Sequence, residues 1–222
     1  MQQPDEIARQ NEELWDARAE TYDTRFGFLR WTQRKLVSLL PLGDNLYLLD
    51  LACGTGRALR YAATRTNGHG EFYGVDISPK MIEQAQAKSQ SYGNLHFYKS
   101  RVEELPFDDN FFDVIISSNA LHHFSDPERA LREANRVLKP NGKLYILDMT
   151  ANTAFMRIVD RFIHKIEPEH VKLYSTKEFQ ALFERAGLCY VTSKRIIPAI
   201  EVHMAEKWYI RRPGNFPISA SL

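Results

Sequence analysis

The sequence contains few cysteines and no long hydrophobic run. Its two cysteines, Cys53 and Cys189, stand far apart and form neither a Cys-x-x-Cys pair nor a Cys/His cluster. This usage argues against a zinc site or a disulfide framework and predicts a cytoplasmic protein. No stretch approaches the roughly 18 consecutive apolar residues that cross a bilayer, and the first residues lack the apolar core of a signal peptide. We therefore expect no metal site and no membrane span.

An excess of charge of one sign is also missing. The chain has 29 basic and 28 acidic residues among 222, for a formal net charge of +1. Such a chain has no global field to hold a long polyanion, so we expect a small-molecule partner and no nucleic acid. Hydrophobic residues make up 44% of the chain, which is enough for the core of one domain. The oligomeric state stays open between a monomer and a homodimer.

What the sequence does contain is a regular alternation of apolar runs and helical patterns. We expect five strands before Thr150, at residues 45–52, 71–78, 95–102, 111–120 and 142–150. Helical patterns lie between them at residues 57–66, 78–93 and 126–138. Two of these helices begin at a capping residue followed by proline, Ser78-Pro79 and Asp126-Pro127. Alternating strands and helices predict a parallel sheet with helices on both faces.

The two ends of the chain add further elements. Helical patterns at residues 5–26 and 28–40 precede the first strand, and a helix at 175–188 precedes two closing strands at 189–196 and 200–210. Residues 153–170 carry a helical apolar stripe that needs a core, a ligand pocket or a partner surface to cover it, and we favour the core. The stripe consists of Phe155, Ile158, Val159, Phe162, Ile163 and Ile166.

The stretch "LLDLACGTGRAL" places Gly54 and Gly56 directly after the first predicted strand. Ligands of open parallel sheets lie over the carboxyl ends of the strands, and glycines there permit positive φ and close approach of a ligand to the backbone. A tight turn without a ligand is the alternative. Asp76 follows Gly56 by 20 positions, at the end of the second predicted strand, where a carboxylate can accept hydrogen bonds from a ribose diol.

Two residues near the glycine turn indicate which kind of nucleoside would bind. A dinucleotide fingerprint has a third glycine where this chain has Leu59. Asp50 opens the turn, and its carboxylate would repel a pyrophosphate but attract an ammonium group. A nucleoside that carries an amino acid therefore fits better than a nicotinamide dinucleotide, although an oxidoreductase stays a third interpretation.

Three stretches together carry a resemblance to a known family. "LDLACGTGRAL", "GVDISPKMIEQA" and "VEELPFDDNFFDVIISSNALHHFSDPERALREANRVLKPNGKLYILD" resemble the class I S-adenosylmethionine-dependent methyltransferases, in particular the small-molecule type 11 group that includes the quinone-biosynthesis methyltransferases. The resemblance runs from about Trp15 to Lys207. It implies an α/β, Rossmann-like fold with a seven-stranded, mostly parallel sheet, helices on both faces and the last strand antiparallel. It also implies S-adenosyl-L-methionine as cofactor and S-adenosyl-L-homocysteine as product.

The resemblance also implies an organisation and a set of contacts. Residues 1–222 would form one domain: N-terminal helices and lid (1–42), cofactor-binding core (43–150), acceptor-pocket insertion (151–174), and closing helix and strands (175–222). The implied cofactor contacts are Tyr22, Asp50, Ala52, Cys53, Gly54, Gly56, Asp76, Ile77, Met81, Arg101, Val102, Asn119 and Ala120. Ala52 stands where the family has its first glycine. Relatives commonly carry an acid at the position of Arg101; arginine cannot accept the adenine amino hydrogen bond, so we expect the backbone around Val102 to read the base and Arg101 to stack or turn away.

The implied activity is methyl transfer to a small, hydrophobic or aromatic acceptor. His122 and His123, just beyond the fourth strand, are the candidates for a general base if the acceptor is a phenol or enol. We expect only one of the two adjacent rings to face inward, and the favoured alternative is that both close a turn by hydrogen bonding. Tyr22 would belong to a lid, or else to the buried side of a helix. A non-catalytic S-adenosylmethionine-binding protein that acts through partner contacts is the alternative function.

Overall fold

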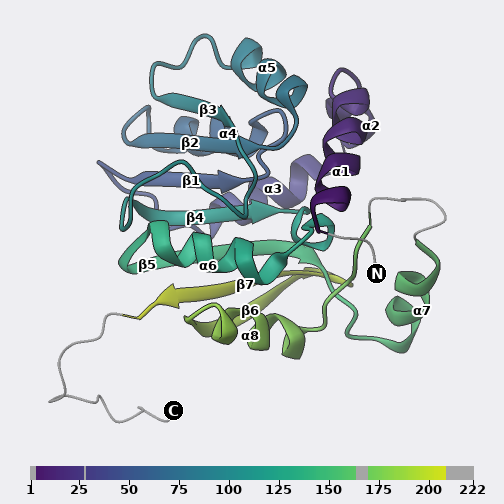
Figure 1. Cartoon of the computed structure of the whole chain (residues 1–222). Helices are drawn as coiled ribbons and strands as arrows, with labels where there is room; N and C mark the ends of the chain where they lie inside the picture. Colours follow the sequence, from purple (N-terminus) through teal and green to yellow (C-terminus); the bar gives the residue numbers. More distant parts are fainter. Residues whose placement is uncertain (1–3, 28, 164–169, 209–222) are drawn as a thin grey trace, which may run out of the picture.

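The computed structural model describes residues 4–27, 29–163 and 170–208. Within these ranges seven strands form one sheet in the order β3-β2-β1-β4-β5-β7-β6 (Figure 1). The strands are β1 (Tyr47–Leu51), β2 (Glu71–Asp76), β3 (Leu95–Lys99), β4 (Phe112–Ser118), β5 (Leu138–Met149), β6 (Leu188–Ile197) and β7 (Ile200–Lys207). Strands β1 to β5 pair in parallel, and β7 is antiparallel to both of its neighbours. The predicted fold class is therefore confirmed.

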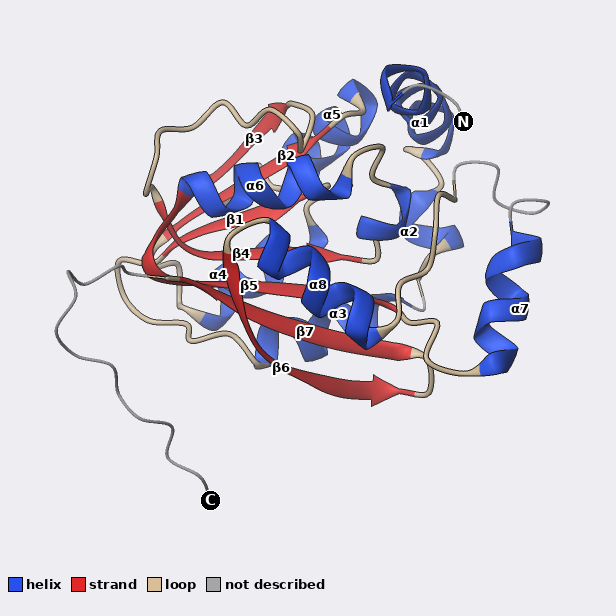
Figure 2. Cartoon of the chain, turned by 60° about the horizontal axis from the view of Figure 1, so that its bottom comes forward, coloured by secondary structure: helices blue, strands red, loops and turns tan. Residues whose placement is uncertain are grey.

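Helices cover both faces of the sheet. They are α1 (Pro4–Arg18), α2 (Tyr22–Arg25), α3 (Leu29–Ser38), α4 (Arg57–Arg65), α5 (Pro79–Lys88), the short 3₁₀ helix η1 (Leu121–His123), α6 (Pro127–Val137), α7 (Ala154–Ile163) and α8 (Thr176–Arg185). Helices α6 and α8 bury their apolar sides against one face, and α3, α4 and α5 pack on the other (Figure 2). The sheet therefore lies between two apolar layers, and α1 and α2 lie at its carboxyl edge (Figure 1). The short helix η1 follows the end of β4 at the same edge.

Local capping fixes where several helices begin. Ser78 Oγ accepts a hydrogen bond from the Met81 amide at 3.0 Å, and Asp126 Oδ1 accepts one from the Arg129 amide at 2.9 Å. Each cap satisfies an amide that has no partner inside its helix. The two predicted caps are therefore confirmed, and they set the direction in which α5 and α6 leave the carboxyl edge.

The helix predicted over residues 5–26 is broken in the structure. Helix α1 ends at Arg18 and α2 begins at Tyr22, with Ala19 fully buried at the bend. The bend brings the Tyr22 ring over the glycine loop: a Cβ built on Gly54 would lie 3.5 Å from Tyr22 Cε1. Tertiary packing overrides a helical pattern here, because a straight helix would carry its second half away from the loop.

The interpretation of the stripe on residues 153–170 as core is wrong for the described part of α7. Phe155, Ile158 and Phe162 are 70%, 57% and 52% exposed, and no side chain of α7 is buried. Both views show α7 beside the body of the domain and not on the sheet (Figures 1 and 2). Ile166 lies outside the described residues. Helical periodicity identified an apolar face correctly but did not reveal what the face contacts.

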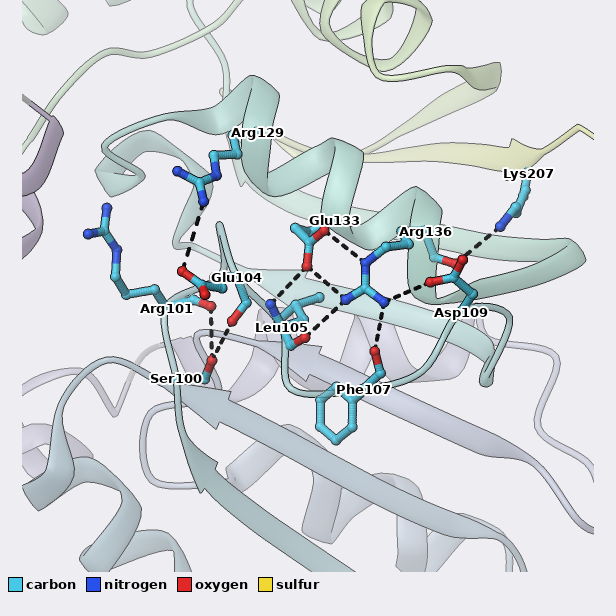
Figure 3. Close-up of polar contacts among 10 residues, drawn as sticks. All are labelled: Ser100, Arg101, Glu104, Leu105, Phe107, Asp109, Arg129, Glu133, Arg136 and Lys207. Carbon is cyan, nitrogen blue, oxygen red and sulfur yellow. Dashed lines mark hydrogen bonds and ion pairs between the residues drawn. The ribbon is translucent and has the colours of Figure 1, made fainter.

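The loop between β3 and β4 is held in place by α6 (Figure 3). The Arg136 guanidinium donates to the carbonyls of Leu105 and Phe107 at 3.0 and 2.7 Å and pairs with Glu133 at 2.8 Å. The Glu133 carboxylate in turn accepts from the Leu105 amide at 2.9 Å. This charge-assisted network fixes the loop that carries Val102 to the carboxyl edge of the sheet.

Candidate functional site

A cavity opens at the carboxyl edge of the sheet, between the ends of β1, β2 and β4 and the helices α1 and α2. Its wall is mostly apolar, with a few polar groups, as is typical of sites for small molecules. It is lined by Ala8, Asn11, Trp15, Tyr22, Ala52, Gly54, Asp76, Ile77, Met81, Ser100, Arg101, Val102, Glu103, Ser118, Asn119, Ala120, His123, Phe124 and Ser125. Of the predicted site residues, Asp50, Cys53, Gly56 and His122 are absent from this wall.

The glycine loop bends back on itself below the cavity. Ala52, Gly54 and Gly56 have φ angles of +55°, +53° and +73°, in the left-handed region. Glycine adopts this region without strain and other residues rarely do, so the angle at Ala52 explains why the family that the sequence resembles has a glycine there. The missing side chain at Gly54 lets the Tyr22 ring approach the loop, since a Cβ there would lie 3.5 Å from Tyr22 Cε1.

Asp76 ties the loop to the end of β2. Its Oδ2 accepts from the Gly54 amide at 2.8 Å, and its Oδ1 accepts from the Ser78 amide at 3.0 Å. The side chain is buried and lines the cavity. Each carboxylate oxygen has a second lone pair, so Asp76 can hold the loop and still accept hydrogen bonds from a ligand diol.

Burial shifts the titration of this carboxyl group. Loss of solvent raises the pKa of Asp76 to about 6; the Ser78 and Gly54 amides work against the shift, and the charge of Asp16 adds to it. The group is therefore charged above about pH 6 and takes up a proton below it.

We expect ligand binding to follow this titration. Protonation removes acceptor capacity toward a ribose. The dissociation constant for S-adenosylhomocysteine, the product that the sequence resemblance implies, should therefore be constant above pH 7 and rise by up to about tenfold per pH unit below pH 6. Calorimetric titration between pH 5 and pH 8 measures it. Asp76→Asn serves as the control, because a residue that does not titrate should flatten the profile. A wild-type profile that is flat down to pH 5 would contradict the assignment.

Three predicted residues belong to β1 or to the glycine loop but do not line the cavity. Asp50 is 1% exposed, its Oδ1 has no hydrogen-bond partner among the described residues, and burial, then the charge of Asp76, raises its pKa. Cys53 donates its amide to Val75 at 2.9 Å, and Gly56 opens α4 against the Phe97 ring. These residues shape the loop; their direct contact with a ligand stays a prediction.

Hydrogen bonds and ion pairs of two acidic side chains hold helices α1 and α2 over the cavity. Asp23 accepts from Thr55 Oγ1 at 2.8 Å and pairs with Arg57 and Lys88 at 2.5 and 2.8 Å. Burial opposes ionisation of Asp23, but the hydrogen bonds from Lys88, Thr55 and Arg57 outweigh it and lower its pKa to about 2. Asp16 accepts from Ser78 Oγ at 2.5 Å. The two carboxylates hold Trp15 and Tyr22 in the cavity wall.

Arg101 is turned toward the lid helix. Its Nη1 donates to Asp5 Oδ1 of α1 at 2.7 Å, and its Nε lies 3.6 Å from Glu103 Oε2. The hydrogen bond from Arg101 to Asp5 raises the pKa of the guanidinium. Val102 is buried beside it in the wall. Among the described residues, the side chain of Arg101 thus has carboxylate partners on both sides.

The two adjacent histidines have different surroundings. His123 lines the cavity and meets the Trp15 ring edge-on, with 5.3 Å between centroids. His122 points away: its Nδ1 lies 2.6 Å from Asp148 Oδ1, and its amide donates to Asp148 Oδ2 at 3.2 Å. The two rings are 3.9 Å apart. The structure therefore brings one ring to the cavity and fixes the other behind it.

Sequence reasoning missed several residues at this site, and three of them carry polar groups that matter here. Asp148 lies near the end of β5 and holds His122, Glu103 lines the cavity at 5% exposure, and Asn11 reaches the cavity from α1. Asp148 could have been found, because an acid at the end of a central parallel strand lies at the binding edge. Glu103 and Asn11 have no such signal, since loops and lid helices meet the cavity only through tertiary packing.

The cavity combines polar and apolar groups of the kind that a nucleoside site needs. It combines a buried carboxylate at the end of β2 with the bare backbone of Gly54 and the apolar side chains of Ile77 and Met81. In the described part of the chain, no three His, Cys, Asp or Glu side chains are grouped closely enough to hold a metal ion. No helix in the described ranges has both the length and the apolar character needed to cross a membrane.

The fold, with a cavity at the carboxyl edge of its sheet, is that of a Rossmann-like protein, a class in which ligands bind at that edge. Residues 49–146 match the methyltransferase domain family Methyltransf_11. The solved structure of YcgJ from Bacillus subtilis is 30% identical, with a TM-score of 0.66, and the match covers 74% of this chain and 70% of that one. The chain belongs to the class I S-adenosylmethionine-dependent methyltransferases of the type 11 group.

Two further comparisons agree with this family. The ubiquinone/menaquinone biosynthesis C-methyltransferase UbiE of a Shewanella strain is 31% identical over 149 residues, which cover 65% of this chain and 59% of UbiE. The curated YcgJ methyltransferase sequence is 34% identical over 149 residues, 64% of this chain and 57% of YcgJ. The chain thus spans less than three fifths of these curated relatives. A Haloferax volcanii protein solved with the Trm112 methyltransferase activator has the same fold, with a TM-score of 0.77 at 23% identity, over 88% of this chain and 98% of that one.

Proposed function

We propose that the protein transfers a methyl group from S-adenosyl-L-methionine to a small, hydrophobic or aromatic acceptor, leaving S-adenosyl-L-homocysteine. One observation carries the proposal: a buried carboxylate, Asp76, holds the bare backbone of Gly54 at the mouth of a largely apolar cavity, in a chain of the methyltransferase family. We include a cytoplasmic location and a monomer or homodimer in the proposal.

Different residues of the cavity would bind different parts of the cofactor. Asp76 would accept from the ribose hydroxyls, Ile77 and Met81 would enclose the adenine, and Gly54 would carry the methionine portion. The same proposal gives supporting contacts to Ala52, Val102, Asn119 and Ala120. When bound, S-adenosylmethionine supplies a methyl group that its sulfonium already activates.

Most of the contribution of the protein is then alignment and exclusion of water. Trp15 and Tyr22 close the cavity from α1 and α2, and Asp23 keeps these helices on the glycine loop. Holding two reactants in line can lower the activation free energy by roughly 7–11 kcal/mol relative to a bimolecular encounter in solution. The apolar wall, and the quinone pathway in the name of the Shewanella relative, support a hydrophobic or aromatic acceptor.

His123 is the group that could take a proton from a phenolic or enolic acceptor. It lines the cavity, while Asp148 holds His122 against its ring from behind. Imidazole suits this task because it titrates near neutral pH. His122 would then act as a positioning residue for His123.

The direct test is transfer of label. The full chain is incubated with methyl-labelled S-adenosylmethionine and a small-molecule extract, and the expected result is label in an organic-soluble product. Asp76→Ala is the matched negative control. Binding of the cofactor without transfer to any acceptor would favour a non-catalytic binding protein, and binding of a nicotinamide cofactor instead would favour an oxidoreductase.

The two histidines should respond differently to replacement. His123→Ala should lower turnover by about 10²-fold, because general-base catalysis contributes on that order, and leave S-adenosylhomocysteine affinity within about twofold. His122→Ala should have a smaller effect through the position of His123. Steady-state kinetics and calorimetry measure both, with the exposed loop residue His69→Ala as control. Unchanged turnover in both variants would remove them from the mechanism.

A further inference from the structure

The lid helix α1 carries a buried amide that the proposed contacts leave unused. Asn11 is 7% exposed and lines the cavity beside Ala8 and Trp15 of the same helix. Buried amides in proteins nearly always have hydrogen-bond partners for both of their polar atoms. Asn11 therefore raises the question of what its second polar atom binds.

One half of this amide is anchored. Its Nδ2 donates to the backbone carbonyl of His123 at 2.8 Å. A carbonyl only accepts, so the amide nitrogen must face His123 and the carbonyl oxygen must face the other way. Asn11 Oδ1 is buried and has no hydrogen-bond partner within residues 4–27, 29–163 and 170–208. The amide thus presents a fixed acceptor at the cavity wall.

An adenine enclosed by Ile77 and Met81, as proposed above, would need such an acceptor for its amino group. Arg101, at the position where relatives commonly carry an acid, only donates, and its guanidinium is paired with Asp5. Glu103 is engaged as well: its Oε1 accepts from Ser125 Oγ at 2.7 Å, and its Oε2 faces Arg101 Nε at 3.6 Å.

Three buried polar side-chain atoms of the described cavity wall make no hydrogen bond. They are Arg101 Nε, Asn119 Nδ2 and Asn11 Oδ1. The first two are donors. Asn11 Oδ1 is therefore the one acceptor in this set, and the adenine amino group is a donor.

We propose that Asn11 Oδ1 accepts a hydrogen bond from the adenine amino group of the cofactor and makes the site selective for adenine over hypoxanthine. This inference rests on the proposed function. Because Asn11 belongs to α1, base recognition depends on the lid being seated, which Asp5 and Asp16 secure through Arg101 and Ser78. A base with an oxygen at position 6 would face Asn11 Oδ1 with a second acceptor, and the two would repel.

The test compares two ligands on the same protein. Calorimetry measures the affinities of the full chain for S-adenosylhomocysteine and for S-inosylhomocysteine, in which an oxygen replaces the amino group. The wild type should prefer the adenosine ligand by about tenfold or more, since an unpaired buried acceptor opposes the inosine ligand. Asn11→Ala should bring the ratio of the two affinities to about one. Gln10→Ala removes an exposed amide from the same helix and should keep the wild-type ratio.

The ratio of the two affinities distinguishes an effect on base recognition from an effect on protein folding. A loss of folded protein weakens both ligands equally, so the ratio is independent of it, and Asn11→Leu repeats the test without leaving space in the wall. A wild-type ratio retained in Asn11→Ala and Asn11→Leu overturns the assignment of Asn11 while the proposed function stands. If the wild type binds neither ligand, both the proposed function and this inference are overturned.

Discussion

Asp76→Ala is expected to weaken binding of S-adenosylhomocysteine by at least ~100-fold. Hydrogen bonds to a charged acceptor contribute about 1.5–3 kcal/mol each, and the carboxylate would accept from two ribose hydroxyls. The substitution also removes the acceptors of the Gly54 and Ser78 amides, so the glycine loop loses its anchor. Isothermal titration calorimetry of the full chain measures the effect.

Two variants make this expectation specific. Glu83→Ala removes an exposed carboxylate from α5, close in sequence to Asp76, and should leave the affinity within about twofold. Asp76→Asn keeps the shape but should also bind weakly, because both carboxylate oxygens accept from backbone amides and an NH₂ group would face one of those donors. Near wild-type affinity in Asp76→Ala would refute the ribose contact.

Gly56→Ala is expected to destabilise the fold by about 2–5 kcal/mol. Its φ angle of +73° costs an L-residue roughly 1–2 kcal/mol, and a Cβ there would lie 2.7 Å from Phe97 Cε1. Forcing extra volume into a packed region adds about 1–3 kcal/mol. For a chain of this size the melting temperature should fall by roughly 5–15 °C, which calorimetry or circular dichroism measures.

A second glycine provides the matched control. Gly68 has a similar φ angle of +81°, but a Cβ built there meets nothing within 4 Å. Gly68→Ala should therefore show the backbone cost alone, roughly 1–2 kcal/mol, and the difference between the variants should report the contact with Phe97. Phe97→Leu combined with Gly56→Ala should recover part of the loss. Equal effects of the two single alanine variants would show that Phe97 does not restrict the loop.

Several parts of the fold could be read from the sequence because they depend on local chemistry. The caps at Ser78 and Asp126 form between residues three positions apart, and the strand positions follow from apolar runs of the right length. The sequence also predicted a glycine turn with positive φ after the first strand and an acid, Asp76, at the end of the second strand. Both are local features of the chain.

Other parts could not be read in this way. The break between α1 and α2, the exposure of Phe155 on α7 and the arrival of Asn11 at the cavity all depend on residues far away in the chain. Asn11 binds a carbonyl 112 positions away, and a helical pattern records which residues share a face but not what that face meets.

The amino-acid sequence by itself determined the alternation of strands and helices, the left-handed loop and the acid that follows the second strand, because periodicity, capping and backbone preference act over a few residues. Only the tertiary structure decided which groups meet at the cavity: His123 in the wall and His122 against Asp148, Arg101 turned to the lid, and Asn11 with a buried, unpartnered oxygen. These outcomes depend on packing and desolvation between distant segments, and no spacing along the chain encodes them.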